Sequence, residues 1–254
     1  MKIRILGCYG SVTRYHRTTS FLVNDSLLLD AGTVSEALSA DELRKITCVL
    51  VSHAHMDHIK GLFAFVDDLF LLGSKGITLA AVQPVLDVIS ANLFNGKVYP
   101  DLTRIPSAEA PIVSAFPLRV GKGAVFDGVE VKPVRVAHTV ACTGFVVKEG
   151  GRGFMFTADS GPTRRFWEVA REEQGLEFIM ADVSFPNRMK KLALKTGHMT
   201  LAMLQSSLHS YGLQDKTVYI THMKPLFSQE IIREVAAAGE RNIRLLEQES
   251  TITV

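Results

Sequence analysis

The chain has 254 residues, of which 47% are hydrophobic and 21% charged, and its formal net charge is +2. This composition is typical of a globular protein and argues against one whose main role is to coat nucleic acid. Three widely separated cysteines exclude a disulfide framework, and no apolar run approaches the roughly 20 residues of a membrane-spanning helix. We therefore expect a single cytoplasmic domain over residues 1–254, with no membrane partner.

Apolar segments typical of strands recur along the whole chain, with helical segments between them. The strand-like segments are KIRILG (2–7), TSFLVN (19–24), SLLLDAG (26–32), TCVLVS (47–52), GITLAAV (76–82), VEVKPVRVA (129–137), TGFVVK (143–148), GFMFTAD (153–159), EFIMADV (177–183), TVYITH (217–222) and IRLLEQ (243–248). A helix is predicted over residues 200–211, because Thr200 can cap its start and Gly212 follows its end. A second is predicted over 228–240. Many strands with interspersed helices predict a layered α/β (α+β) domain.

Five of the strand-like segments end at a residue that can bind a metal ion or move a proton. These residues are His53, His138, Asp159, Asp182 and His222. In layered α/β proteins, ligands gather where the carboxyl ends of strands meet loops. We therefore expect the five strand ends to form one shared site.

The segment SHAHMDH (52–58) contains three histidines and an aspartate. Residues two apart in an extended segment point the same way, so His53 and His55 can share one ion. If the chain then turns into a helix, Asp57 and His58 face a second ion. Imidazole and carboxylate suit zinc and similar divalent ions, and core packing does not require such a cluster.

Two ions need more ligands than this segment supplies. His138, Asp159 and His222 are of the required kinds. Taken alone, each has an ordinary interpretation: a single histidine is usually a hydrogen-bonded residue, and the aspartate of TADSGPT is a common turn former. The neighbouring histidine cluster favours the metal-binding interpretation for all three.

At these residues the sequence resembles the metallo-β-lactamase-fold hydrolases, which carry H-x-H-x-D-H, then a single histidine, a bridging aspartate and a final histidine. The closest resemblance is to the branch of class II cyclic-nucleotide phosphodiesterases, which is related to ribonuclease Z. It extends over RTTSFLV (17–23), LLLDAG (27–32), NLFNGKVYPDLTRIP (92–106), DSGPT (159–163), DVSFPN (182–187), TGHMT (196–200) and YITHMKP (219–225). The fold implied is a four-layer αββα sandwich with a dinuclear site along one edge.

The resemblance also implies a role for each site residue. The implied ligands are His53, His55 and His138 for one ion and Asp57, His58 and His222 for the other, with Asp159 as the bridge. The implied catalytic residues are Asp57, Asp182 and His198, of which Asp182 orients His198 as in ribonuclease Z. The family more often has Glu at position 182 and Thr at position 160, where this chain has Asp and Ser. Asp30, at a strand end, is a candidate to orient a ligand histidine.

The two-ion arrangement suits hydrolysis of a small phosphodiester, and the resemblance implies a 3′,5′-cyclic nucleotide such as cAMP as the substrate. A metal-bridged hydroxide would attack phosphorus, and His198, just before the helix that begins near Thr200, would protonate the leaving oxygen. The two ions are expected to be Zn²⁺, with Mn²⁺ or Fe²⁺ as alternatives. A small-molecule substrate is expected rather than nucleic acid, and a homodimer is the assembly to test.

Three other functions stay open. The first is a tRNA 3′-end endonuclease like ribonuclease Z, against which stand the low net charge and the lack of a Gly/Pro-rich arm. The second is a thioester, lactone or β-lactam hydrolase on the same scaffold. The third is a non-enzymatic, metal-stabilised binding module, which the complete set of seven candidate ligands disfavours.

Overall fold

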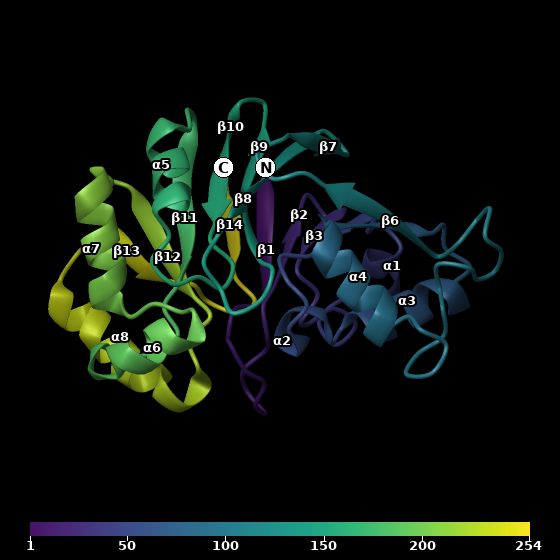
Figure 1. The fold of residues 1–254 in the computed structure, drawn as a ribbon, viewed down its shortest axis with the longest axis horizontal. Helices are drawn as coiled ribbons and strands as arrows, with labels where there is room; N and C mark the ends of the chain where they lie inside the picture. Colours follow the sequence, from purple (N-terminus) through teal and green to yellow (C-terminus); the bar gives the residue numbers. More distant parts are fainter.

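The computed structural model describes residues 1–254 and contains two seven-stranded sheets that lie between two layers of helices (Figure 1). In spatial order, the first sheet comprises β14 (Thr251–Thr253), β1 (Lys2–Gly7), β2 (Ser20–Val23), β3 (Leu27–Leu29), β4 (Cys48–Leu50), β5 (Ile77–Val82) and β6 (Val113–Leu118). The second comprises β13 (Ile243–Leu245), β12 (Thr217–Thr221), β11 (Leu176–Asp182), β10 (Arg152–Phe156), β9 (Thr143–Glu149), β8 (Val129–Arg135) and β7 (Ala124–Phe126).

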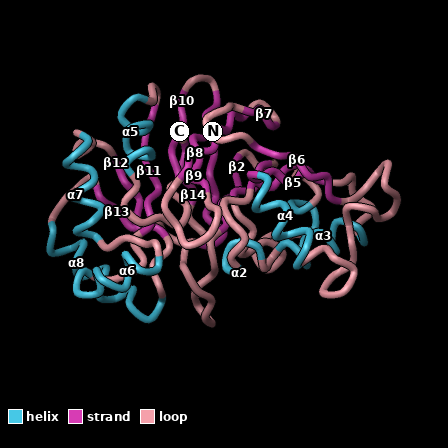
Figure 2. The backbone as a smooth tube through the Cα atoms, viewed as in Figure 1, coloured by secondary structure: helices cyan, strands magenta, loops and turns pink.

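The helices cover the outer faces of the sheets, and the strands fill the interior (Figure 2). Beside the first sheet are α1 (Ala40–Leu43), α2 (Met56–Ile59), α3 (Leu62–Leu71) and α4 (Gln83–Asn92). Beside the second are α5 (Arg164–Glu172), α6 (Lys190–Thr196), α7 (Leu201–Tyr211) and α8 (Ser228–Ala238), with short 3₁₀ turns at Asn187–Met189 and Pro225–Phe227. The layers follow the predicted order of helix, sheet, sheet and helix. No helix combines the length and the apolar composition that a membrane crossing requires.

Four of the seven strands in each sheet are mutually parallel, and their direction determines where the loops gather. Strands β3 to β6 are mutually parallel, as are β10 to β13. Strands β3 and β4 are buried along their whole length, as expected for parallel strands covered on both faces. The two sheets pack through side chains such as Phe21 and Phe156, whose ring centroids lie 5.2 Å apart. The parallel strands of each sheet therefore direct their carboxyl ends to one edge.

The predicted elements agree with the structure except at the edges of the sheets. Each predicted strand is present, and α7 has Thr200 at its N-cap and Gly212 in the left-handed conformation at its end, with φ of 66°. Strands β6, β7 and β14 were not predicted, and each lies at an edge of its sheet. They are largely exposed, and β6 contains Pro117. These three edge strands lack the buried apolar pattern on which sequence prediction depends, whereas the fourth edge strand, β13, was predicted.

Candidate metal centre

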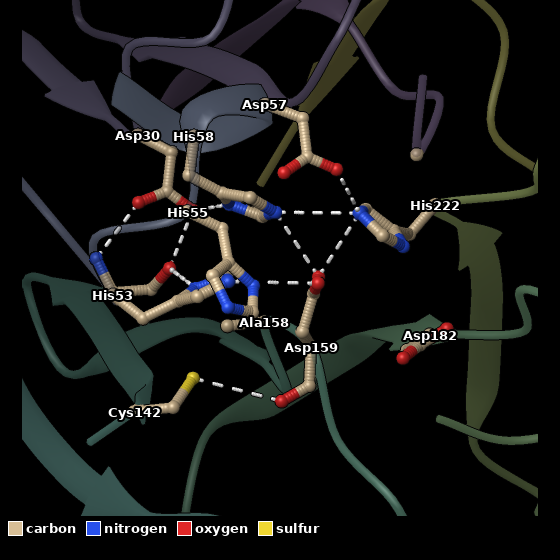
Figure 3. A network of polar contacts seen from close by, with 12 residues as sticks. Asp30, His53, His55, Asp57, His58, Cys142, Ala158, Asp159, Asp182 and His222 are labelled. Atoms are coloured by element: carbon tan, nitrogen blue, oxygen red, sulfur yellow. Dashed lines mark hydrogen bonds and ion pairs between the residues drawn. The ribbon is translucent and has the colours of Figure 1, made fainter. Parts of the chain in front are cut away.

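Strand ends from both sheets meet at one edge of the sandwich. The first sheet contributes His53, which follows β4, and the second contributes His138 after β8, Asp159 after β10 and His222 after β12. The carboxylate of Asp159 lies at the centre of the cluster, with histidines around it (Figure 3). The structure thus brings together residues that are up to 169 positions apart (His53 to His222, 222 − 53).

One set of side chains, here called the His53 group, consists of His53, His55 and His138 together with Asp159. Their potential ligand atoms all lie within 4.8 Å of one another. His138 Nε2 is 3.2 Å from His55 Nδ1, and His53 Nε2 is 3.6 Å from Asp159 Oδ2. Three imidazole nitrogens and one carboxylate oxygen therefore face a common point.

A second set, the His222 group, consists of Asp57, His58 and His222, again with Asp159. Asp159 Oδ1 is 3.1 Å from His58 Nε2 and 3.2 Å from His222 Nε2. His222 Nε2 is also 3.3 Å from Asp57 Oδ2. Asp159 belongs to both groups, and its two oxygens face different ones. This is the arrangement that a carboxylate bridging two ions requires.

Local backbone geometry separates the two groups along the H-x-H-x-D-H segment. His55 has extended dihedral angles, with φ of −72° and ψ of 149°, and is the N-cap of the short helix α2. Before it, the strand-like period of two aligns His53 with His55; after it, the helix turns Asp57 and His58 toward the second group. Gly61 lets the backbone pass closely beneath, since a Cβ there would lie 2.7 Å from the Ala31 carbonyl oxygen.

The backbone is strained next to the central carboxylate. Ala158 has φ of 52° and His222 has φ of 64°, a left-handed region that few non-glycine residues adopt. Gly10 packs against the His222 ring, where an added Cβ would lie 2.6 Å from Cε1. Strained residues of this kind persist only where their surroundings fix them, and they concentrate at functional sites.

Burial and charge set the protonation of the cluster. Burial lowers the pKa of His53 well below its usual value, and the neighbouring His58 adds to the effect. Burial opposes ionisation of Asp159, but the surrounding His222 and His58 outweigh it and hold the pKa of that carboxyl well below its usual value. For His58, burial is outweighed by the carboxylates of Asp159 and Asp30, which raise its pKa. The carboxylates therefore favour positive charge at His58, whereas burial favours the neutral imidazole at His53.

Two of the histidines have a specific acceptor for the ring nitrogen that points away from the cluster. His58 Nδ1 is 2.7 Å from Asp30 Oδ2, as the position of Asp30 at a strand end suggested. His138 Nδ1 is 3.0 Å from the carbonyl oxygen of Gly197. When the imidazole is neutral, such a contact places the proton on Nδ1 and leaves Nε2 with a lone pair that can face the cluster.

Two buried serines complete these contacts, and sequence reasoning missed both. Ser52 Oγ lies 3.0 Å from His53 Nδ1, and Ser184 Oγ lies 2.9 Å from His222 Nδ1. The sequence carries a weak signal for each, because Ser52 immediately precedes the first histidine of the cluster and Ser184 stands two residues after Asp182.

The predicted pair of Asp182 and His198 is present beside the His222 group. Asp182 Oδ2 is 2.7 Å from His198 Nδ1, although aspartate is shorter than the glutamate found more often in the family. Asp182 Oδ1 accepts a hydrogen bond from Ser184 at 2.6 Å, and its Oδ2 also accepts one from the Ser160 N–H at 3.1 Å. Because both oxygens already have donors, Asp182 is suited to orienting its neighbours rather than to holding a further ion.

A family profile described as a beta-lactamase superfamily domain matches residues 25–223. The chain belongs to this superfamily. Ribonuclease Z of Archaeoglobus fulgidus is 21% identical in an alignment that covers 90% of this chain and 89% of that protein. A probable 3′,5′-cyclic-nucleotide phosphodiesterase of Yersinia pestis is 26% identical, covering 88% and 78%. The structure of unliganded yeast PDE1 aligns with a TM-score of 0.83 at 19% identity, over 100% and 99% of the two chains.

Membership of the beta-lactamase superfamily confirms the resemblance inferred from the motifs and the predicted αββα sandwich, which is the metallo-β-lactamase fold. The chain is a hydrolase of this fold. The fold implies divalent metal ions, and the clustered histidines and aspartates provide the groups to hold them.

The residues of the cluster fit such ions on independent grounds. His53 Nε2 is buried and has no hydrogen-bond partner within the protein. His58 Nε2 and His222 Nε2, both oriented inward, lie only 3.3 Å apart. Buried polar atoms without partners are costly, and a cation held between these atoms would satisfy them.

Proposed function

We propose that this hydrolase is a phosphodiesterase that binds two divalent ions, with Zn²⁺ as the preferred metal. The His53 group would hold one ion, the His222 group the other, and Asp159 would bridge them. Histidine and aspartate ligands suit zinc, and the division of the Asp159 oxygens between the two groups supports a dinuclear site. Bound ions of this kind supply Lewis acidity toward phosphoryl oxygens and lower the pKa of water.

The observation that carries the proposal is the contact of 2.7 Å between Asp182 and His198 beside the candidate ligands. His198 is buried, and its ring is stacked on that of His222 with centroids 5.3 Å apart. Burial lowers the pKa of His198, but the carboxylate of Asp182 outweighs it, so the net shift is upward. A protonated imidazole held in this way is suited to donate a proton to the leaving oxygen of a phosphodiester.

The substrate that we propose is a small phosphodiester, and specifically a 3′,5′-cyclic nucleotide such as cAMP. Relatives named as cyclic-nucleotide phosphodiesterases support this choice. Lys224 supports an anionic substrate, because its ammonium group lies 3.7 Å from Asp57 Oδ2 at the site and its side chain is partly exposed. The formal net charge of +2 is small for a protein that holds long nucleic acids by charge alone.

A second candidate is tRNA 3′-end cleavage, which the similarity to ribonuclease Z over 90% of this chain favours. Both reactions cleave a phosphodiester and need the same proton donor, so they differ in how the substrate is held. Thioester or lactone hydrolysis stands third, because the leaving groups of those substrates depend less on a buried acid.

The proposal is tested by turnover of bis-p-nitrophenyl phosphate, cAMP and a tRNA precursor by protein of measured metal content, with and without a chelator. We expect chelator-sensitive hydrolysis of the first two and no cleavage of the precursor. Cleavage of the precursor alone would favour the ribonuclease Z-like function. If two ions are bound but no diester is hydrolysed, the proposal is wrong and thioesters and lactones should be tested.

A further inference from the structure

Ser184 stands at the junction between the His222 group and the pair of Asp182 and His198. It is fully buried, two residues beyond the end of β11. Its Oγ lies 2.6 Å from Asp182 Oδ1, 2.9 Å from His222 Nδ1 and 3.1 Å from His198 Nδ1. No other hydroxyl contacts both of these histidines. The Ser184 hydroxyl therefore links a candidate ligand, His222, to the candidate proton donor, His198.

The direction of these hydrogen bonds follows from counting protons. The Ser184 hydroxyl has one proton and two neighbours that can only accept, the carboxylate of Asp182 at 2.6 Å and the carbonyl oxygen of His222 at 3.1 Å. Ser184 donates this proton in the shorter, charge-assisted contact with Asp182. Ser184 Oγ must then accept from the ring of His222, which places a proton on Nδ1. His222 Nε2 is left with a lone pair, 3.2 Å from Asp159 Oδ1.

The same carboxylate fixes the second histidine directly. Asp182 Oδ2 accepts from His198 Nδ1 at 2.7 Å, so the Nδ1 position of His198 also carries a proton. Asp182 thus contacts the His198 ring directly and the His222 ring through the hydroxyl of Ser184. The rings themselves are stacked at an interplanar angle of 17°.

We propose that Ser184 is a positioning residue that extends the influence of Asp182 to His222, so that one carboxylate orients both the proton donor and a ligand of the second ion. The inference rests on the proposed function, since it assigns His198 and His222 their roles there. It predicts that the loss of this single hydroxyl weakens binding at the His222 group while the direct contact between Asp182 and His198 remains.

The other half of the molecule offers a matched control in Ser52. Its Oγ donates to Asp30 Oδ2 at 2.8 Å and lies 3.0 Å from His53 Nδ1, so it joins a buried aspartate to a histidine in the same way. Ser52 is likewise fully buried. It contacts His53 and neither His222 nor His198. Ser52→Ala therefore removes an equivalent hydroxyl and leaves the contacts of Ser184 in place.

The test compares Ser184→Ala, Ser184→Thr and Ser52→Ala with the unmodified protein in the zinc-loaded state. Chelator competition gives the two zinc dissociation constants, and spectra of ¹⁵N-histidine-labelled protein report the imidazole N–H protons. We expect Ser184→Ala to weaken one zinc site by about 10- to 100-fold, the range typical of contacts behind a ligand histidine. The exchange-protected Nδ1–H signal of His222 should be lost in this variant and persist in Ser52→Ala. Ser184→Thr, which keeps the hydroxyl, should restore both properties.

Two outcomes would overturn the inference. One is unchanged zinc affinity and an unchanged His222 signal in Ser184→Ala. The other, which needs no variant, is the absence of a protected Nδ1–H on His222 in the unmodified protein. Neither readout requires a substrate, so the failure of the unmodified protein to hydrolyse diesters would count against the proposed function and leave the role of Ser184 to be judged separately. Added zinc should restore the turnover of Ser184→Ala far more than that of His198→Ala.

Discussion

The two halves of the sandwich orient their histidines with the same parts assembled in different ways. In the first half, Asp30 at the end of β3 and Ser52 just beyond β4 meet across parallel strands, and the serine N–H and hydroxyl both donate to the aspartate at 2.7 and 2.8 Å. In the second half, Asp182 and Ser184 are two residues apart at the end of one strand. Each unit is buried and combines a carboxylate, a hydroxyl and two histidines.

The difference lies in which histidines the two units orient. Asp30 and Ser52 contact His58 and His53, which are both candidate ligands. Asp182 and Ser184 contact His222, a candidate ligand, and His198, which belongs to neither ligand group. Under the proposed function, the first unit would serve ion binding alone, whereas the second would serve both ion binding and proton transfer. Variants that change ion binding and turnover to different extents test this difference between the two units.

The largest effect is expected from Asp159→Ala, because this carboxylate serves both halves. We expect the loss of at least one ion per chain, measured by metal analysis, and a fall in diester turnover of about a thousandfold or more. Lewis-acid stabilisation is worth several kcal/mol, and each ~1.4 kcal/mol corresponds to a factor of ten in rate. Asp41→Ala, at an exposed aspartate, is the control. Full metal occupancy in Asp159→Ala would rule out a bridging role.

His198→Ala should affect the second half alone. We expect both ions to remain bound and the turnover of cAMP to fall by about 10²- to 10⁴-fold, the usual contribution of a general acid. The fall should be smaller for bis-p-nitrophenyl phosphate, whose leaving group needs less protonation. Equal losses for both substrates, or unchanged turnover, would return His198 to a structural role.

The sequence predicted the parts of this site that depend on local spacing. The alternation of His53 and His55 before a helical turn is a property of the chain itself, and the strand-end positions of Asp30 and Asp182 follow from the apolar segments before them. Most strands were predictable for the same reason, because buried parallel strands are apolar along their length. The edge strands β6, β7 and β14 were not, since exposure removes that pattern.

The contacts behind the ligands depend on tertiary alignment and were beyond sequence reasoning. A serine gives no sign of its partner until the strands are aligned, and Ser52 meets Asp30 only because β3 and β4 are parallel neighbours. The contact of His138 with the Gly197 carbonyl oxygen likewise joins segments 59 residues apart. The left-handed conformations of Ala158 and His222 are imposed by the assembled site and have no counterpart in the local sequence.

A smaller effect, on affinity, should follow from Asp30→Asn and differ from that of Asp182→Asn. The amide at position 30 offers one acceptor fewer to His58 and Ser52, so we expect zinc binding to weaken by about 10- to 100-fold and the protein to lose about 1–3 kcal/mol of stability. Asp182→Asn should reduce turnover by a larger factor than it reduces zinc affinity, because His198 depends on it. Chelator competition and kinetics at saturating zinc separate the two effects. If the ratio of turnover loss to zinc-affinity loss is the same in Asp30→Asn and Asp182→Asn, the proposed difference between the two halves is wrong.

The smallest effect is expected from Glu173→Gln, at a carboxylate in the second half that is remote from the site. Glu173 pairs with Lys132 at 2.6 Å and Lys148 at 2.9 Å, on β8 and β9. Burial opposes its ionisation, but the two ammonium groups outweigh it and lower its pKa below the usual value. A lowered folded-state pKa stabilises the protein above the pKa of an unfolded glutamate, about 4.3, and this contribution is lost as the pH falls through the folded value.

Urea unfolding at pH 7 should therefore show a loss of about 1 kcal/mol or less for Glu173→Gln, and the difference from the unmodified protein should shrink as the pH falls below 4. Glu172→Gln, at the adjacent exposed residue, provides the baseline. Zinc affinity and turnover should not change in either variant. This separates a carboxylate that only stabilises the fold through lysines from Asp30 and Asp182, whose partners are histidines of the site. A change in zinc affinity in Glu173→Gln would mean that the orientation of the histidines depends on the whole second sheet as well as on Asp182 and Ser184.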